Sequence, residues 1–167
     1  NMEFGLNGTY EGMSAVIIPA ICDTLRCMTQ NWRFGVKSIP AIAIVYPQNR
    51  RSPASTDYLI SEYEGVLLQL AALTGCMMSE AALCETIRIY NEHNRTMREF
   101  AAAAAEHLDV ITPLVRHAVF KSAFFFEKSE HTAIVQDIIA GLKALPVCQW
   151  SGKKVVLTGI MCEPEQV

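Results

Sequence analysis

The sequence lacks the features of a membrane protein and of a nucleic-acid binder. None of its apolar runs approaches the roughly 20 residues that a membrane-spanning helix needs. Charged residues make up only 19% of the 167 residues and the net charge is −3, so no basic surface for nucleic acid is indicated. A hydrophobic share of 51% excludes a disordered chain. We therefore expect one folded domain, or one domain with part of another.

The motifs of several enzyme classes are also missing. The six cysteines form no C-x-x-C pair, which argues against a zinc ribbon and a thioredoxin-type redox site. Neither an H-E-x-x-H metal motif nor a G-x-S-x-G hydrolase elbow occurs. The glycines at positions 5, 8 and 12 precede the first expected strand and therefore do not form a phosphate-binding loop. The opening residues show no signal-peptide pattern, and from this we expect a cytoplasmic protein with reduced thiols.

Two apolar segments predict buried β-strands, Ala15–Ala20 and Ile39–Tyr46. Neither alternates between apolar and polar residues, which is typical of parallel strands covered on both faces. A short helix or turn is expected between them, around Thr24–Trp32. A further strand is expected at residues 152–159, where a β-branched run ends in a glycine.

Helical periodicity dominates the ninety or so residues between the second and third strands. Apolar residues recur there every three or four positions, and the four expected helices begin at Thr56, Ser79, Thr112 and Ser129. The predicted fold class is α/β: a partial doubly wound parallel sheet, a helical segment, and the first strand of a second α/β domain. The corresponding boundaries are 1–55 for the end of the first domain, 56–150 for the helical connecting region and 151–167 for the start of the second domain.

The candidate functional residue is Cys22, which follows the first strand directly. In open α/β sheets, ligands and chemistry collect at the carboxyl ends of the strands. A thiol in that place is a nucleophile, a metal ligand or a small buried hydrophobe, and the pattern alone leaves these open. The four histidines show no metal-ligand spacing and are expected at the surface or partly buried. Glu62 is expected on a solvated helix face, and Phe124–Phe126 in a core or a subunit interface.

An ordered set of segments carries a family resemblance over nearly the whole chain. IIPAICDTLR comes first, followed by a strand that ends in Tyr46-Pro47 and by the helix YLISEYEGVLLQLAALTG. Then come MSEAALCETIRIYNEHNRTMREF, FFFEKSEHTAIVQDIIAGLKALP and GKKVVLTGIM. In this order the sequence resembles the 2-hydroxyacyl-CoA dehydratase family, whose relatives include the benzoyl-CoA reductase subunits.

The resemblance implies a function for the intact protein. Members of the family are heterodimers of α/β domains in which three cysteines of a subunit hold a [4Fe-4S] cluster. A separate ATP-hydrolysing activator protein, itself an iron–sulfur protein, injects one electron. The reaction removes the hydroxyl of an (R)-2-hydroxyacyl-CoA to give a 2-enoyl-CoA. The added electron makes this possible, because the α-hydroxyl is a poor leaving group and the β-proton is unactivated.

For individual residues, the resemblance implies only that Cys22 in PAICDTLR is a cluster ligand. The other two ligands of the family would lie before residue 1 and after Val167, so we expect the 167 residues alone to bind no cluster and to be inactive. The expected partners are a second dehydratase subunit, the activator and acyl-CoA, without nucleic acid or membrane. The alternatives are a benzoyl-CoA reductase-like subunit that reduces an aryl-CoA, and a scaffold module that has lost the cluster.

Overall fold

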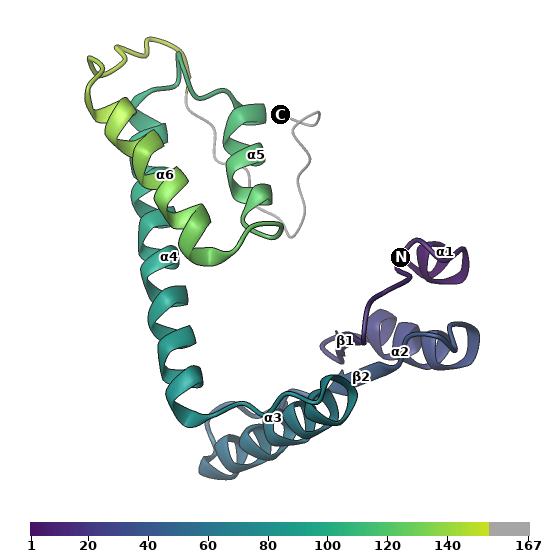
Figure 1. Ribbon diagram of the computed structural model, residues 1–167. Helices are drawn as coiled ribbons and strands as arrows, with labels where there is room; N and C mark the ends of the chain where they lie inside the picture. The colour runs from purple at the N-terminus through teal and green to yellow at the C-terminus, as the bar shows by residue number, and fades with distance from the viewer. Residues whose placement is uncertain (154–167) are drawn as a thin grey trace. The chain divides into compact units, whose positions relative to one another are not determined.

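The computed structural model describes residues 1–153 (Figure 1). The chain forms two compact units, of which the first comprises Asn1–Ser79 and the second begins at Glu80. The strand expected at 152–159 falls on residues beyond the described part of the chain. We describe each unit by itself.

The first unit is built around a parallel βαβ arrangement. Strand β1 (Val16–Pro19) pairs with β2 (Ala41–Ile44), with Val16 opposite Ala41 and Pro19 opposite Ile44. Helix α2 (Asp23–Gly35) connects the two strands. Parallel strands require such a crossover connection, because the chain must return from the carboxyl end of one strand to the amino end of the next. The predicted α/β class with a partial parallel sheet is confirmed.

Helix α1 (Met2–Leu6) was not expected from the sequence, because its five residues are too few to show a period. It packs against α2 through Gly5. A Cβ atom at this position would come within 2.8 Å of the Trp32 ring and 2.9 Å of Val36. Trp32 is buried, and its indole N–H donates to the carbonyl oxygen of Ile39 at 2.9 Å. The glycine thus permits the close approach of the helix to the indole ring.

Helix α3 (Pro53–Thr74) covers β2 and belongs to the first unit. Val66 of α3 packs with Ile42 and Ile44 of β2 in a small core cluster. The helix begins three residues before the expected Thr56 cap, because Ser52 is its N-cap and Pro53 its first residue, a position that proline favours. It ends at Gly75, whose positive φ of 73° is typical of a helix-terminating glycine. Its contacts group it with the sheet of the first unit, and the domain boundary expected after residue 55 stays a prediction.

Three helices make up the described part of the second unit: α4 (Glu80–Glu106), α5 (Pro113–Ser122) and α6 (Lys128–Lys143). Helices α4 and α6 pack along each other (Figure 1). Their core includes Phe100, Val135, Ile139 and Leu142, each at most 5% exposed. Helix α5 ends at Ser122, and a turn at 123–125 follows it. Val119 and Phe120 of α5 pack against the core.

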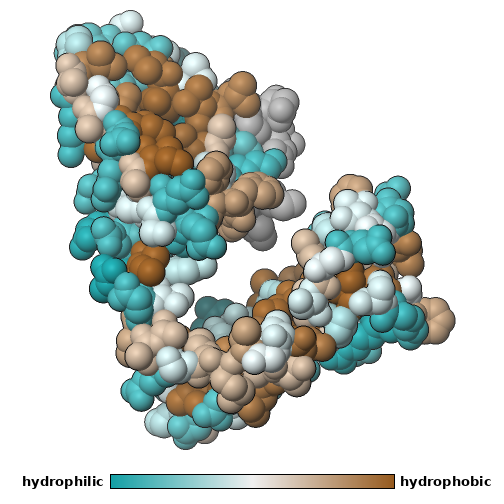
Figure 2. All heavy atoms as spheres, in the orientation of Figure 1, coloured by the Kyte–Doolittle hydropathy of each residue, from teal (hydrophilic) through white to brown (hydrophobic). Residues whose placement is uncertain are grey.

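Hydrophobic side chains also remain at the surface of the second unit (Figure 2). Phe124 and Phe125 are 84% and 77% exposed, so within the described residues they do not belong to a core. The interface interpretation of this aromatic run stays a prediction. Across residues 1–153, no helix has both the length and the apolar character needed to cross a bilayer.

Candidate functional site

Cys22 lies where the sequence analysis expected it, just beyond the carboxyl end of β1. The strand pairing extends past Pro19, since the amide of Ala20 donates to the carbonyl oxygen of Ile44 at 2.8 Å. Cys22 is the N-cap of α2, with an extended backbone (φ −147°, ψ 167°), and its side chain is exposed. The thiol therefore does not fill the core.

Two cavities of about 450 and 410 Å³ lie at the carboxyl ends of the two strands, and Cys22 itself lines neither of them. Arg26, one turn after Cys22 on α2, lines both. The larger cavity extends along the loop after β2 to Tyr58 of α3, and the smaller includes Cys27. Cys27 is exposed. A cationic side chain and an exposed thiol thus share one edge with Cys22.

Helix α3 holds the end of β2 through Glu62. The Glu62 carboxylate accepts a hydrogen bond from the Val45 amide at 2.8 Å. The sequence placed Glu62 on a solvated face, and this was wrong, because the half-buried carboxylate caps the strand end. Next to it, a hydrogen bond with Tyr63 and partial burial raise the pKa of the Tyr46 phenol. The loop that follows β2 is therefore anchored to a regular helix on one side.

At this edge Cys22 supplies a soft metal donor. In the described part of the chain, no group of three or more His, Cys, Asp or Glu side chains could hold a metal ion together. The exposed Cys22 thiol at the tip of a strand suits one corner of an iron–sulfur cluster, which takes thiolate ligands. The remaining corners would need donors from outside residues 1–153.

A second constellation lies in the second unit and was missed in the sequence. His93 of α4 and His131 of α6 are 4% and 1% exposed, and His107 is also buried. The expectation of surface or partly buried histidines is therefore wrong for these three. His93 Nε2 lies 2.9 Å from His131 Nδ1, and His131 Nε2 lies 2.9 Å from Ser122 Oγ of α5. These two contacts link helices α4, α6 and α5.

The hydroxyl of Ser122 sets the direction of these hydrogen bonds. It donates to the Val119 carbonyl oxygen at 2.9 Å and therefore accepts from Nε2–H of His131. Nδ1 of a neutral His131 is then an acceptor, so His93 donates through Nε2–H. Burial, the neighbouring His131 and Lys128 lower the pKa of His93. Burial also lowers the pKa of His131, so both hydrogen-bonded histidines are uncharged at neutral pH.

The signal for this burial was present in the sequence. His93 lies three residues after Tyr90 and four before Met97, so it occupies the apolar stripe of α4. His131 likewise precedes Val135 by four residues on the buried face of α6. The stripe predicts that both are buried. Their pairing across 38 residues depends on how α4 and α6 pack.

These observations define a class: an α/β protein whose exposed thiol stands at the carboxyl edge of parallel strands, where ligands collect. The family model of the 2-hydroxyglutaryl-CoA dehydratase D-component matches residues 1–167, and the chain belongs to this family. The resemblance identified in the sequence is thereby confirmed.

Individual relatives agree with the family model. The chain is 46% identical over 166 residues to the lactoyl-CoA dehydratase subunit beta of Anaerotignum propionicum, covering 99% of the chain and 44% of that protein. It is 34% identical over 162 residues to the (R)-2-hydroxyglutaryl-CoA dehydratase subunit beta of Acidaminococcus fermentans, covering 96% and 43%. To one subunit of the benzoyl-CoA reductase of Thauera aromatica it is 21% identical over 165 residues, covering 97% and 42%. The chain thus spans less than half the length of these relatives.

Proposed function

We propose that the polypeptide carrying this sequence is a subunit of a 2-hydroxyacyl-CoA dehydratase, a lyase that converts an (R)-2-hydroxyacyl-CoA into a 2-enoyl-CoA. The observation that carries the proposal is the exposed Cys22 thiol at the carboxyl end of β1, in a chain of the dehydratase family. Because the chain covers 44% of the lactoyl-CoA dehydratase subunit, the activity belongs to the complete protein. We propose the cytoplasm as its compartment, where reduced thiols persist.

The proposed cofactor is a [4Fe-4S] cluster with Cys22 as one of its thiolate ligands. When bound, such a cluster supplies one-electron chemistry and an iron site that is open to a substrate oxygen. The proposed partners are the second dehydratase subunit and a separate ATP-dependent activator that delivers the electron. The subunit names of the relatives support a multisubunit enzyme.

The residues of this chain contribute position and charge. The sulfur of Cys22 is held in a defined place, because the backbone of this residue is anchored between β1 and the first turn of α2. Arg26 brings a positive charge to the same edge, where it would bind the anionic part of the acyl-CoA in the adjoining cavities. Glu62 and Tyr63 contact Val45 and Tyr46 and so anchor the start of the loop after β2.

The runner-up is an aryl-CoA reductase of the benzoyl-CoA reductase type. The identity of 21% to the reductase subunit, against 46% and 34% to two dehydratase subunits, favours the dehydratase. The same values disfavour a scaffold module, because both dehydratase relatives align along almost the whole chain.

Turnover by the complete complex tests the proposal. The anaerobically purified subunits, with activator, ATP and reductant, are assayed on a series of (R)-2-hydroxyacyl-CoA thioesters and on benzoyl-CoA. We expect 2-enoyl-CoA from at least one 2-hydroxyacyl-CoA and no reduction of benzoyl-CoA. Reduction of benzoyl-CoA without dehydration of any 2-hydroxyacyl-CoA would establish the reductase instead. Absence of both activities, together with absence of a cluster from this subunit, would support the scaffold.

A further inference from the structure

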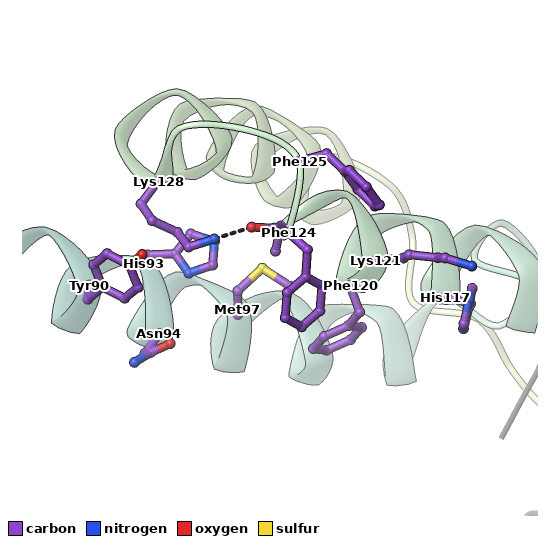
Figure 3. A pocket seen from close by; sticks show the side chains of 11 residues that line it. Tyr90, His93, Asn94, Met97, His117, Phe120, Lys121, Phe124, Phe125 and Lys128 are labelled. Atoms are coloured by element: carbon purple, nitrogen blue, oxygen red, sulfur yellow. Dashed lines mark hydrogen bonds between the residues drawn. The ribbon is translucent and has the colours of Figure 1, made fainter. Parts of the chain in front are cut away.

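Two open surfaces of the described chain differ in how closely they specify a partner. A cavity of about 670 Å³ in the second unit is lined mainly by apolar side chains of α4, α5 and the turn after α5, such as Met97 and Phe120 (Figure 3). Hydrophobic contact is not directional, so walls of this kind accept many partners. The outer edge of β1 in the first unit is more specific, because an unpaired strand edge binds another strand.

The hydrogen bonds of β1 show which of its backbone groups face away from β2. The amide of Val16 donates to the Pro40 carbonyl oxygen at 2.9 Å. The amide of Ala20 donates to the Ile44 carbonyl oxygen at 2.8 Å. Successive residues of a strand turn their N–H and C=O groups to opposite sides, so those of Ile17 point away from β2. Within residues 1–153, no backbone or side-chain group forms a hydrogen bond with them.

The outer edge of β2, by contrast, is bonded to side chains of the same unit. By the same alternation, the odd-numbered residues of β2 face away from β1. Of these outward groups, the Ala41 carbonyl oxygen accepts from Nε–H of Arg33 at 3.3 Å. Directly after the strand, the Val45 amide donates to the Glu62 carboxylate at 2.8 Å. Side chains that cap a strand edge protect it from pairing, which favours growth of the sheet at β1.

The side chain of Ile17 also indicates that the sheet continues past β1. Its register partner Ile42 is 2% exposed and packs against Val66 of α3. Ile17 lies on the same face of the sheet but is 45% exposed. A strand of a parallel sheet is normally covered on both faces, so a half-exposed β-branched residue beside a covered one marks the place where covering elements are missing.

The segment that leads into β1 indicates the direction from which a further strand would come. Helix α1 packs on α2 through Gly5, and Met2 contacts the core cluster that joins α2 to Ile18 of β1. The segment before β1 therefore covers the same face of the sheet as α2. Crossovers between parallel strands are right-handed in about 98% of cases. A strand that reaches β1 over this face must then lie on the side of β1 away from β2.

We propose that the outer edge of β1 pairs with a further parallel strand of the same polypeptide, which precedes residue 1 and bonds to the N–H and C=O groups of Ile17. The lactoyl-CoA dehydratase subunit, of which the chain covers 44%, has ample length outside the aligned region for such a strand. Pro19, at the next outward position, offers only its carbonyl oxygen to the new ladder. Cys22 then follows an interior strand and is flanked by the carboxyl ends of two neighbours. The inference concerns the sheet and does not depend on the proposed reaction.

Hydrogen exchange at single-residue resolution tests this pairing in the natural full-length polypeptide, kept without oxygen, over a range of concentrations and with and without the second subunit. We expect the Ile17 amide to exchange at least about a hundredfold more slowly than the Ala43 amide in the monomeric polypeptide. Ala43 is the matched control, because its N–H faces outward from β2 and no side chain described here caps it. Exchange of Ile17 as fast as that of Ala43 would overturn the proposal. Protection of Ile17 that requires dimerisation or the second subunit would also overturn it, because another chain would then occupy the edge.

Thiol labelling measures whether the side chain at position 17 is covered. Ile17→Cys and Lys37→Cys are introduced separately into the full-length polypeptide, and the reaction of each new thiol with N-ethylmaleimide is followed by mass spectrometry. Lys37 is exposed and charged, so the variant at this position reports the rate of a solvated thiol. We expect the thiol introduced at position 17 to react at least about tenfold more slowly in the folded protein and equally fast in denaturant. Equal rates in the folded protein would contradict the proposal, and the exchange measurement on the unaltered protein decides it if Ile17→Cys does not fold.

Discussion

The two units of this protein place their reactive side chains in opposite environments. In the first, Cys22 and Cys27 are exposed at the carboxyl edge of a parallel sheet. In the second, His93 and His131 are buried and bonded to each other. An exposed thiol can bind a group from outside the chain, whereas a buried paired imidazole contributes to the packing of its helices. We therefore propose a functional role for the exposed Cys22 thiol of the first unit and a stabilising role for the hydrogen-bonded histidines of the second.

The largest expected effect comes from removing the core of the second unit. Phe100 is 0% exposed, and Phe100→Ala should lower the free energy of unfolding by about 3–5 kcal/mol, because the lost contacts leave a cavity. Hydrogen exchange should show faster exchange in α4 and α6 than in α2. Phe34→Ala, at an exposed position, should change stability by less than about 0.5 kcal/mol. Equal effects of the two substitutions would show that α4 and α6 do not pack as described.

The histidine chain should contribute less, but with a distinctive pH dependence. His131→Phe leaves Nε2–H of His93 without its acceptor and should cost about 1–3 kcal/mol. In the intact protein, both folded pKa values lie below the unfolded value of about 6.5. The unfolded chain therefore binds more protons in the window just below this value, and stability rises with pH across it.

Unfolding by denaturant at several pH values checks this dependence. The stabilisation from the neutral histidines should be fully present above about pH 6.5 and should be lost as the pH falls toward the lowered folded values. His131→Phe should flatten the plot of unfolding free energy against pH, because one of the two histidines is gone and the other loses its partner. A curve for the unaltered protein that is level from about pH 7.5 to pH 5 would contradict the buried neutral chain.

Substituting Gly5 and Gly65 of the first unit by alanine should change the free energy of unfolding in opposite directions. Gly5→Ala should destabilise it by about 1–3 kcal/mol, because the new methyl group would overlap the Trp32 ring. Gly65→Ala, in the middle of α3 with open space around it, should stabilise it by about 0.5–1 kcal/mol. Thermal unfolding followed by Trp32 fluorescence measures both. A neutral Gly5→Ala would mean that α1 does not rest on the indole ring.

The smallest predicted effect compares two helix N-caps, one in each unit. The Thr112 hydroxyl accepts a hydrogen bond from the Val115 amide at 3.3 Å, so Thr112→Ala should cost about 1 kcal/mol. Ser52 makes no such side-chain bond at the start of α3, and Ser52→Ala should cost less than about 0.5 kcal/mol. Denaturant unfolding of both variants provides the measurement. The reverse order of the two losses would refute the capping geometry.

Local patterns in the sequence were sufficient for most elements and for the position of Cys22. Strand β1 and the helix start after it are set within ten residues, so the thiol at the strand end could be predicted. The same holds for the end of α3, which Gly75 fixes by its own backbone preference. These features depend on short-range sterics and capping.

Features that depend on contacts between distant residues could not be predicted. Glu62 was assigned to a solvated face because the pattern of its own helix does not reveal the Val45 amide, which lies 17 residues earlier, directly after β2, and donates to it. The link from His93 to His131 and on to Ser122 likewise requires the packing of three helices. Burial could be read from the apolar stripe, but the partner could not.

The central claim is that Cys22 holds an iron–sulfur cluster, and iron analysis with Mössbauer spectroscopy tests it most directly. The complete holoenzyme is prepared without oxygen in two forms, Cys22→Ala and Cys27→Ala, which each remove one exposed thiol of α2 or its N-cap. We predict that Cys22→Ala loses the cluster of this subunit and that Cys27→Ala keeps it. Full iron content and unchanged spectra in Cys22→Ala would contradict the account.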